Sequence, residues 1–299
     1  MKVFLIIIFF LINIKSYSQS NGLISHYMFN PLIINPAYAG FDQALTLNAL
    51  AKIQWAQVEG SPRTQIFSLH TPVEEKVSLG LILANDQMGP LNQKGIFASY
   101  AYRIPLQEGF ISMGLQAGTT IYDLQEENIN LLDPQDPVFT TNLHNLVVPN
   151  FGSGFLYSSK NFYLGVAIPQ LFRISAEENI SYSLQRQNVL LHGSYSFALS
   201  NDLQVNPNTL INLRNGHPAE INLGVNFLIR KVLWTGILYR NLNTFTFLAK
   251  IHVNPQLNLG YAYDYHSGEI RSMAHGSHEF LISYQLNHKK DKLVLPKFF

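Results

Sequence analysis

Two histidines and a carboxylate lie close together near the end of the sequence, and side chains of these types can bind a metal ion together. His275, His278 and Glu279 are candidates for a zinc site, because imidazole nitrogens and carboxylate oxygens are common ligands of that metal. On a β-strand, however, His275 and His278 would point to opposite faces, since side chains alternate along a strand. No further ligand follows at a set spacing. We therefore interpret the cluster as structural and expect no metal site.

The usual motifs of covalent catalysis and nucleotide binding are missing from the sequence. The chain has no cysteine, which excludes a cysteine nucleophile and a thiolate metal site. Ser153 lies between two glycines, but within a strand-like alternation and not in the strand-to-helix turn of a nucleophile elbow. The sequence contains no Gly-rich phosphate loop and no dinucleotide fingerprint. It therefore predicts a protein with no enzymatic activity, no catalytic residue and no cofactor.

The elements that carry these residues are predicted to be β-strands with one apolar face. In the segments 111–121 and 221–229, apolar residues occupy nearly every second position, and small or polar residues lie between them. In a soluble β-sandwich the apolar face would form the core. In an outer-membrane barrel it would face lipid, and the small, polar face would line the lumen.

Connection lengths distinguish between these two folds. We predict about fourteen strands, near 44–56, 63–72, 76–85, 95–105, 109–121, 149–158, 161–168, 187–199, 203–213, 219–229, 232–240, 244–253, 256–264 and 277–286. Every second connection is short, and the others are mostly longer, above all 122–148, 169–186 and 265–276. This alternation is typical of periplasmic turns and extracellular loops. We therefore predict an all-β fold, a transmembrane antiparallel β-barrel of the outer-membrane type, with a soluble all-β domain as the alternative.

The start of the chain and its composition agree with export to the outer membrane. Residues 1–18 resemble a cleaved signal peptide, with Lys2, an apolar run over 3–14 and small residues at 16 and 18. Charged residues make up 13% of the chain, against about 25% in an ordinary soluble domain. The net charge of +1 gives no reason to expect nucleic acid as a partner. We expect residues 43–286 to form the barrel and 287–299 a periplasmic tail, with a docking peptide as the alternative for the tail.

Residues 19–42, which we call the collar, precede the first predicted strand. Asn30-Pro31 and Asn35-Pro36 break any regular helix or central strand, because proline fixes φ and lacks an N–H group. The segment is nevertheless apolar and aromatic, so we expect it to pack in the lumen or at the periplasmic end. Two interpretations stay open: a plug, or a docking site for partners. The predicted partner-binding residues are Tyr27, Phe29, Asn30, Pro31, Asn35, Pro36, Tyr38 and Gly40.

Charged residues on the predicted inward face form the second candidate site. We call them the lumen charged cluster: Lys52, Glu220, Arg240, Lys250, Asp264 and Glu279. They would form either an ion-pair network that holds the barrel mouth in shape or a polar surface that grips a ligand or protein segment. Tyrosines and a tryptophan on the strands predict the aromatic belts of a membrane protein: Trp55, Tyr100, Tyr102, Tyr195, Tyr239, Tyr261, Tyr263 and Tyr284.

The collar also carries a family resemblance. The run N-P-x-x-x-N-P-A-Y-A-G from Asn30 to Gly40 resembles the opening motif of the PorP/SprF family of outer-membrane proteins. Weaker similarities follow in order along the mature chain, among them Gln54-Trp55 with 60–64, 99–102, 149–152, 260–264 and 276–279. One departure is a doubled Asp-Pro at 133–134 and 136–137, which leaves the shape of that loop open.

The resemblance implies a non-enzymatic outer-membrane component of the type IX secretion system and gliding machinery of Bacteroidetes. Members of the family assist secretion or cell-surface anchoring of large secreted proteins such as adhesins. The implied partners are secreted cargo proteins with a type IX C-terminal signal, periplasmic secretion and motor components, and outer-membrane lipid. The alternative function is a passive or FadL-like channel for small solutes, which a barrel of this size is wide enough to form.

Overall fold

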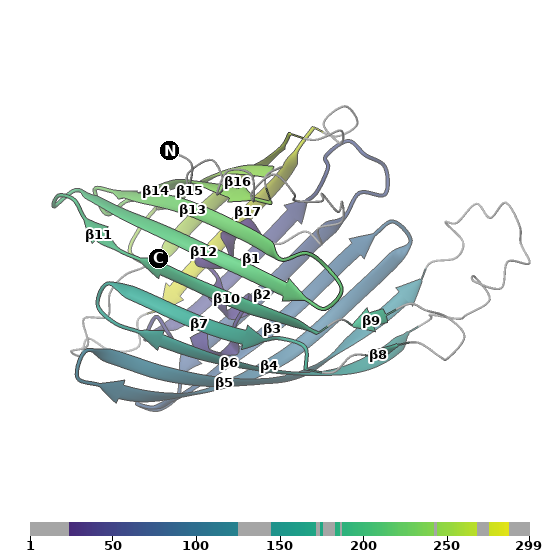
Figure 1. Ribbon diagram of the computed structural model, residues 1–299, viewed down its shortest axis with the longest axis horizontal. Coiled ribbons are helices and arrows are strands. Elements are labelled where there is room, and N and C mark those ends of the chain that lie inside the picture. The colour runs from purple at the N-terminus through teal and green to yellow at the C-terminus, as the bar shows by residue number, and fades with distance from the viewer. Residues whose placement is uncertain are drawn as a thin grey trace, which may run out of the picture.

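The strands form one closed antiparallel barrel (Figure 1). The computed structural model describes residues 24–124, 145–171, 174–175, 183–185, 187–241, 244–267 and 275–286. The first strand, β1 (Leu45–Ile53), pairs with the last, β17 (Ser277–Leu286), and a further pairing of β10 (Asn188–Tyr195) with β12 (Leu203–Arg214) completes the ring. Closure gives every strand two neighbours, so backbone groups are satisfied where lipid offers no hydrogen bonds.

The described strands confirm the prediction of about fourteen crossings. The large sheet holds 15 strands, and β10 and β11 (Phe197–Ala198) are two parts of one crossing interrupted at Ser196, which leaves 14. The others are β2 (Arg63–Pro72), β3 (Val77–Met88), β4 (Leu91–Leu106), β5 (Gly109–Leu124), β6 (Leu146–Ser158), β7 (Phe162–Ile168), β13 (Glu220–Ile229), β14 (Leu233–Arg240), β15 (Thr244–His252) and β16 (Leu257–His266). Two short strands, β8 (Ile174–Ser175) and β9 (Ser183–Gln185), pair only with each other.

One hairpin is longer than predicted. We expected strands that end near 85 and resume near 95, but β3 and β4 continue to a two-residue turn at 89–90. The residues between, such as Asp86, Gln87 and Asn92, are polar on both faces of the hairpin. A sheet that rises beyond the bilayer has water on its outer side and needs no apolar face, so the alternation that marks a membrane strand is absent there.

The connections divide the barrel into two different ends. The turns at 73–76, 107–108 and 230–232 lie at the end where β1 begins and β17 finishes, which we call the short-turn end. The opposite, long-loop end carries the connections 54–62 and 215–219. In outer-membrane barrels the short-turn end is periplasmic. The predicted loop 122–148 lies mostly outside the described residues, as do parts of 169–186 and 265–276, the signal peptide and the tail.

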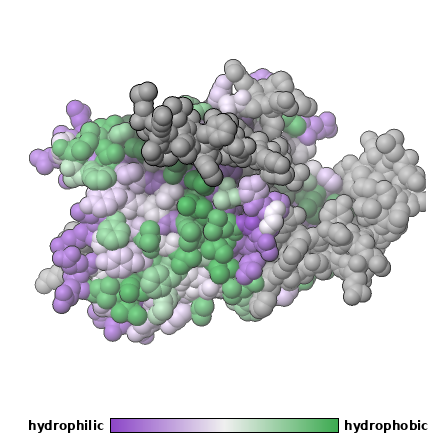
Figure 2. Space-filling view, in the orientation of Figure 1, coloured by the Kyte–Doolittle hydropathy of each residue, from purple (hydrophilic) through white to green (hydrophobic). Residues whose placement is uncertain are grey.

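The outward face of the wall is apolar, as lipid requires. In β13 exposed Ile221, Leu223 and Val225 alternate with buried residues, and in β5 the Leu115 side chain is 63% exposed. Figure 2 shows hydrophobic residues over much of the visible wall and hydrophilic residues at the short-turn end. Among the described residues, no helix is long and apolar enough to cross a membrane.

The two faces of β5 predict opposite responses to an added charge. Leu115 points to lipid and Gln116 points into the lumen. We expect Leu115→Arg to impair assembly, because a charge on the lipid face at mid-membrane costs about 2 to 4 kcal/mol. Gln116→Arg places the same group on the polar face and should assemble like the wild type. Heat-modifiable migration of the membrane fraction measures assembly of both variants, and equal defects would contradict this assignment of the two faces.

Candidate functional site

The described part of the collar, residues 24–42, crosses the lumen from the long-loop end to the short-turn end. Ser25 contacts Glu279, two residues from the long-loop end of β17, and Gly40 contacts Arg103, close to the short-turn end of β4. Figure 1 shows this purple segment enclosed by the strands. The chain then leaves the lumen and enters β1.

Each Asn-Pro step begins a short 3-10 turn. The collar contains η1 (Ser25–Met28), η2 (Pro31–Ile33) and η3 (Pro36–Tyr38), and proline occupies the first position of the last two. The Asn35 side chain accepts a hydrogen bond from the Ala37 N–H at 2.9 Å, which caps η3. At Gly40 the backbone has φ +66°, a left-handed conformation that favours glycine, and there the chain turns towards the first strand.

All eight predicted collar residues are buried inside the barrel. Tyr27 is 2% exposed, Phe29 6%, and Asn30, Asn35 and Tyr38 are fully buried; Pro31, Pro36 and Gly40 are buried as well. Their role in partner binding stays a prediction. What surrounds them in this structure is the barrel wall, so the collar has the geometry of a plug.

Asn35 and Tyr38 tie the middle of the collar to the wall. The Asn35 amide nitrogen donates to the Phe155 carbonyl at 3.1 Å and lies 3.0 Å from the His192 Nε2 atom. The Tyr38 hydroxyl lies 3.3 Å from His192 Nδ1, and its ring packs edge-on against Tyr163.

Asn30 and Tyr27 make the corresponding contacts nearer the long-loop end. The Asn30 Oδ1 atom accepts from the Ser68 hydroxyl at 2.9 Å and from Asn48 Nδ2 at 3.4 Å. The Tyr27 hydroxyl donates to Asn208 Oδ1 at 2.8 Å. These bonds are made by side chains, so the wall recognises particular collar residues and not only an apolar segment.

Inward apolar residues of the wall form sockets for the collar. Tyr27, Met28 and Phe29 pack in one cluster with wall residues, and the Phe29 ring lies edge-on to Trp234 at 5.9 Å. The wall side chains of that cluster are Leu50, Leu190, Leu210, Leu228, Trp234, Leu238, Leu248, Ala262 and Leu281. These inward apolar residues were not identified in the sequence analysis. One of them was recognisable, because Leu50 is an apolar residue on the predicted polar face of its strand.

Glycines on the inner face make room for the collar backbone. A Cβ atom at Gly114 would collide with the Ala37 nitrogen, and one at Gly154 would collide with the Asn35 side chain. At Gly80 it would lie 3.1 Å from the Leu32 side chain, and at Gly260 3.0 Å from His26 Nε2. The small residues of the polar face therefore have a specific use, since they allow close approach of a second chain segment.

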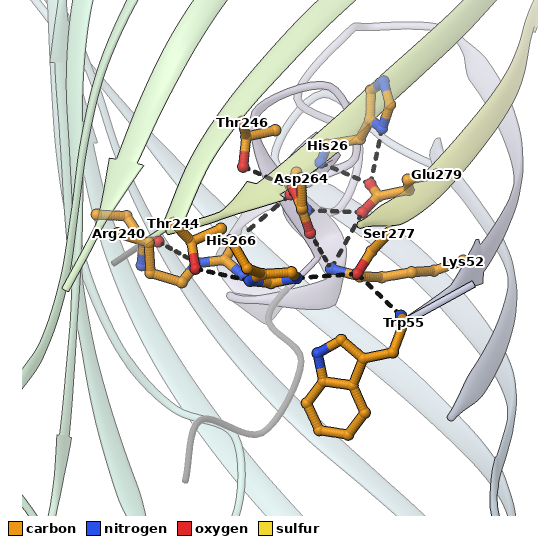
Figure 3. A network of polar contacts seen from close by, with 12 residues as sticks. His26, Lys52, Trp55, Arg240, Thr244, Thr246, Asp264, His266, Ser277 and Glu279 are labelled. Atoms are coloured by element: carbon orange, nitrogen blue, oxygen red, sulfur yellow. Dashed lines mark hydrogen bonds and ion pairs between the residues drawn. The ribbon is translucent and has the colours of Figure 1, made fainter. Parts of the chain in front are cut away.

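Glu279 holds the long-loop end of the collar (Figure 3). One carboxylate oxygen accepts from the Ser25 N–H at 2.9 Å, and the other accepts from the His26 N–H at 2.8 Å and lies 2.7 Å from His26 Nδ1. Asp264 accepts from the Ser25 hydroxyl at 3.0 Å. Lys52 lies between the two carboxylates, 3.1 Å from Asp264 and 3.7 Å from Glu279. Buried charges require such partners.

The structure brings together four of the six residues of the lumen charged cluster. Lys52, Asp264 and Glu279 meet directly, and Arg240 reaches the same place by donating to the Ser25 hydroxyl at 3.4 Å. The other two make their direct contacts elsewhere. Glu220 pairs with Arg214 at 3.3 Å. The Lys250 ammonium lies 4.1 Å above the ring of Phe29, a cation–π contact with the collar.

The histidine cluster near the end of the chain does not form a metal site in the described part of the structure. His278 lies on the outward face of β17, with Nδ1 2.8 Å from the Tyr261 hydroxyl, whereas Glu279 points into the lumen. Across the residues that the structure describes, no group of three or more His, Cys, Asp or Glu side chains is placed to hold a metal ion.

Comparison with solved structures shows the fold. The outer membrane protein Omp33 of Acinetobacter baumannii is similar with a TM-score of 0.51 and 6% sequence identity, over 82% of this chain and 98% of that one. The CymD monoaromatic hydrocarbon channel has a TM-score of 0.49 and 13% identity, over 91% of this chain and 95% of that one. At such low identity the likeness concerns the barrel architecture alone. No curated protein matches the sequence.

Comparison with protein families shows where the chain belongs. The model of the type IX secretion system membrane protein PorP/SprF matches residues 16–284. This range takes in the collar and all the barrel strands up to the last, so the resemblance in the Asn-Pro motif extends over the molecule and the family prediction is confirmed. The chain belongs to the PorP/SprF family of type IX secretion system membrane proteins.

Proposed function

We propose that this barrel is a plugged, non-enzymatic component of the type IX secretion and gliding machinery that assists secretion or cell-surface anchoring of large secreted proteins such as adhesins. The observation that supports this most is the collar, which crosses the lumen and packs its residues against the inner face of the wall. A closed barrel of this kind acts on its partners by binding them and not by letting them pass.

The alternative, a passive channel for small solutes, fits the lumen less well. A channel wall presents polar residues to water, whereas here inward leucines and Trp234 pack on Tyr27, Met28 and Phe29. Hydrogen bonds hold the collar at both ends and in the middle. A solute would have to displace these contacts before it could cross.

The proposed partners are secreted cargo with a type IX C-terminal signal and periplasmic secretion or motor components. The collar reaches close to both mouths, since Ser25 lies near the long-loop end and Gly40 near the short-turn end. A partner at either mouth is therefore near the plug. We propose that Tyr27, Phe29, Asn30, Pro31, Asn35, Pro36, Tyr38 and Gly40 serve partner binding by holding the collar in this position.

Removal of the protein tests the proposed function. We expect a strain that lacks it to lose one or more large proteins from the cell surface, because their export or retention depends on the barrel. Quantitative proteomics of surface-shaved cells measures this, and the protein expressed from a second locus should restore the wild-type pattern. An unchanged surface proteome together with slower uptake of small solutes would contradict the proposal and favour the channel.

Weakening of the plug tests the interpretation of the collar. The combined substitution Asn35→Ala, Pro36→Ala and Tyr38→Ala removes the wall hydrogen bonds, the fixed turn and the aromatic contact, while the strands stay intact. We expect a barrel that still assembles but conducts ions in planar bilayers, where the wild type does not.

A matched triple substitution controls for this experiment. Glu74, Glu75 and Lys76 form an exposed turn at the short-turn end, and their replacement by Ala should leave conductance at the wild-type level. If the collar variant stays closed while it loses copurifying secreted proteins, the collar is a docking site and not a plug.

A further inference from the structure

The outer wall carries a groove on its lipid-facing side, where β13, β14, β15 and β16 lie next to one another. Its volume is about 410 Å³. The residues that line it are Phe227, Thr235, Gly236, Ile237, Phe247, Leu248, Ala249, Tyr261 and Tyr263. The side chains of Phe227, Phe247 and Tyr261 in its rim point outward, whereas the Leu248 side chain belongs to the cluster inside the lumen.

Strand register explains why a groove forms at this place. Thr235 pairs with Ala249 across β14 and β15, and the two make a small floor. In the same row Phe227 pairs with Thr235 on one side and Tyr261 pairs with Ala249 on the other. Two small residues are thus flanked by aromatic rings, which stand higher above the sheet than their neighbours.

The row nearer the long-loop end closes the groove above the floor. Ile237 pairs with Phe247, and Phe247 pairs with Tyr263. Ile237 and Phe247 are each 50% exposed, so both present their side chains to the surroundings of the barrel. In a transmembrane barrel these surroundings are lipid hydrocarbon.

Polar groups lie at the long-loop end of the groove. The Tyr261 hydroxyl lies 2.8 Å from His278 Nδ1, and the Tyr263 hydroxyl donates to the His275 carbonyl at 3.2 Å. When Nδ1 of His278 accepts from Tyr261, Nε2 carries the hydrogen of the ring and is a donor for an oxygen atom. Tyrosine at the level of the headgroups has an apolar body and a polar tip, which suits an amphiphile.

We propose that this groove is a binding site for one lipid of the outer leaflet, with an acyl chain on Thr235 and Ala249 and headgroup oxygens near His278. Lipid chains are as apolar as leucine, so the hydrophobic effect does not distinguish a bound lipid from bulk lipid. Retention depends instead on van der Waals contact in a matched groove and on hydrogen bonds at the headgroup. The groove and the polar groups beside it offer both.

Native mass spectrometry of the full-length protein, purified in detergent and supplied with lipid A from the same membranes, tests the proposal. We expect wild-type protein to keep one lipid after mild delipidation. Ala249→Phe fills the floor of the groove and should lower retention at least about tenfold, which corresponds to about 1.4 kcal/mol. Because Ala249 points to lipid, the larger apolar side chain leaves the barrel interior unchanged.

The matched control is Ala117→Phe. Ala117 also points to lipid and pairs with a second small residue, Ala98, but its row continues to Leu81 and Phe151 and is not part of the groove. This variant should keep lipid as the wild type does. Thr235→Leu fills the same groove from β14 and replaces Ala249→Phe if that variant lacks heat-modifiable migration.

The outcomes divide clearly. Retention by wild type and Ala117→Phe with loss in both groove variants supports the site. The proposal is overturned if wild-type protein binds no lipid or if the groove variants retain lipid as the wild type does. It is also overturned if Ala117→Phe loses as much lipid as the groove variants. His278→Ala separates the headgroup from the chain: a drop in retention for lipid A but not for a detergent of the same chain length supports the polar contact, and an equal effect on both contradicts it.

Discussion

Fourteen strands enclose more space than their own inward side chains can fill, and this excess is the constraint on which the rest of the structure depends. A barrel of about eight strands is just wide enough for side chains to pack its interior, and wider barrels hold ligands, plugs or water. Here residues 24–42 occupy part of that space and pack on the inner face. The inner face therefore contains both apolar and polar residues. Apolar side chains pack around Tyr27 and Tyr38. Polar side chains form hydrogen bonds with Ser25, Asn30 and Asn35.

The irregular backbone of the collar and the polar wall depend on each other. A segment with two Asn-Pro steps cannot satisfy its backbone groups in a regular ladder, and buried groups without partners are costly. The wall supplies the missing partners: Ser112 donates to the Ala37 carbonyl at 2.7 Å, and Arg103 donates to the Gly40 carbonyl at 3.1 Å. Non-helical backbone at membrane depth is tolerated because protein, and not lipid, surrounds it.

The parts of the fold that face lipid were predictable, and the parts that face the collar were not. Lipid demands an apolar outer face at every crossing, so residues such as Leu115 and Leu223 marked their strands reliably. The lumen makes no such uniform demand: Leu50 and Trp234 are apolar there because Phe29 and its neighbours lie against them. A segment without periodicity carries no signal of what it packs on, so sequence left the collar open between plug and docking site.

The two ends of the collar differ in the partners that the wall loses if they move. If Ser25 and His26 leave, Asp264 and Glu279 still face the Lys52 ammonium at 3.1 and 3.7 Å, so the buried carboxylates stay compensated. If Gly40 leaves, the Arg103 guanidinium loses the carbonyl to which it donates and keeps the ring of Phe110, 4.2 Å away. Asp42, which also acts electrostatically on Arg103, belongs to the collar as well, so this guanidinium depends on the collar more than the two carboxylates do. Loss of the collar contacts at the long-loop end therefore leaves the buried charges of the wall better compensated than loss of those at the short-turn end.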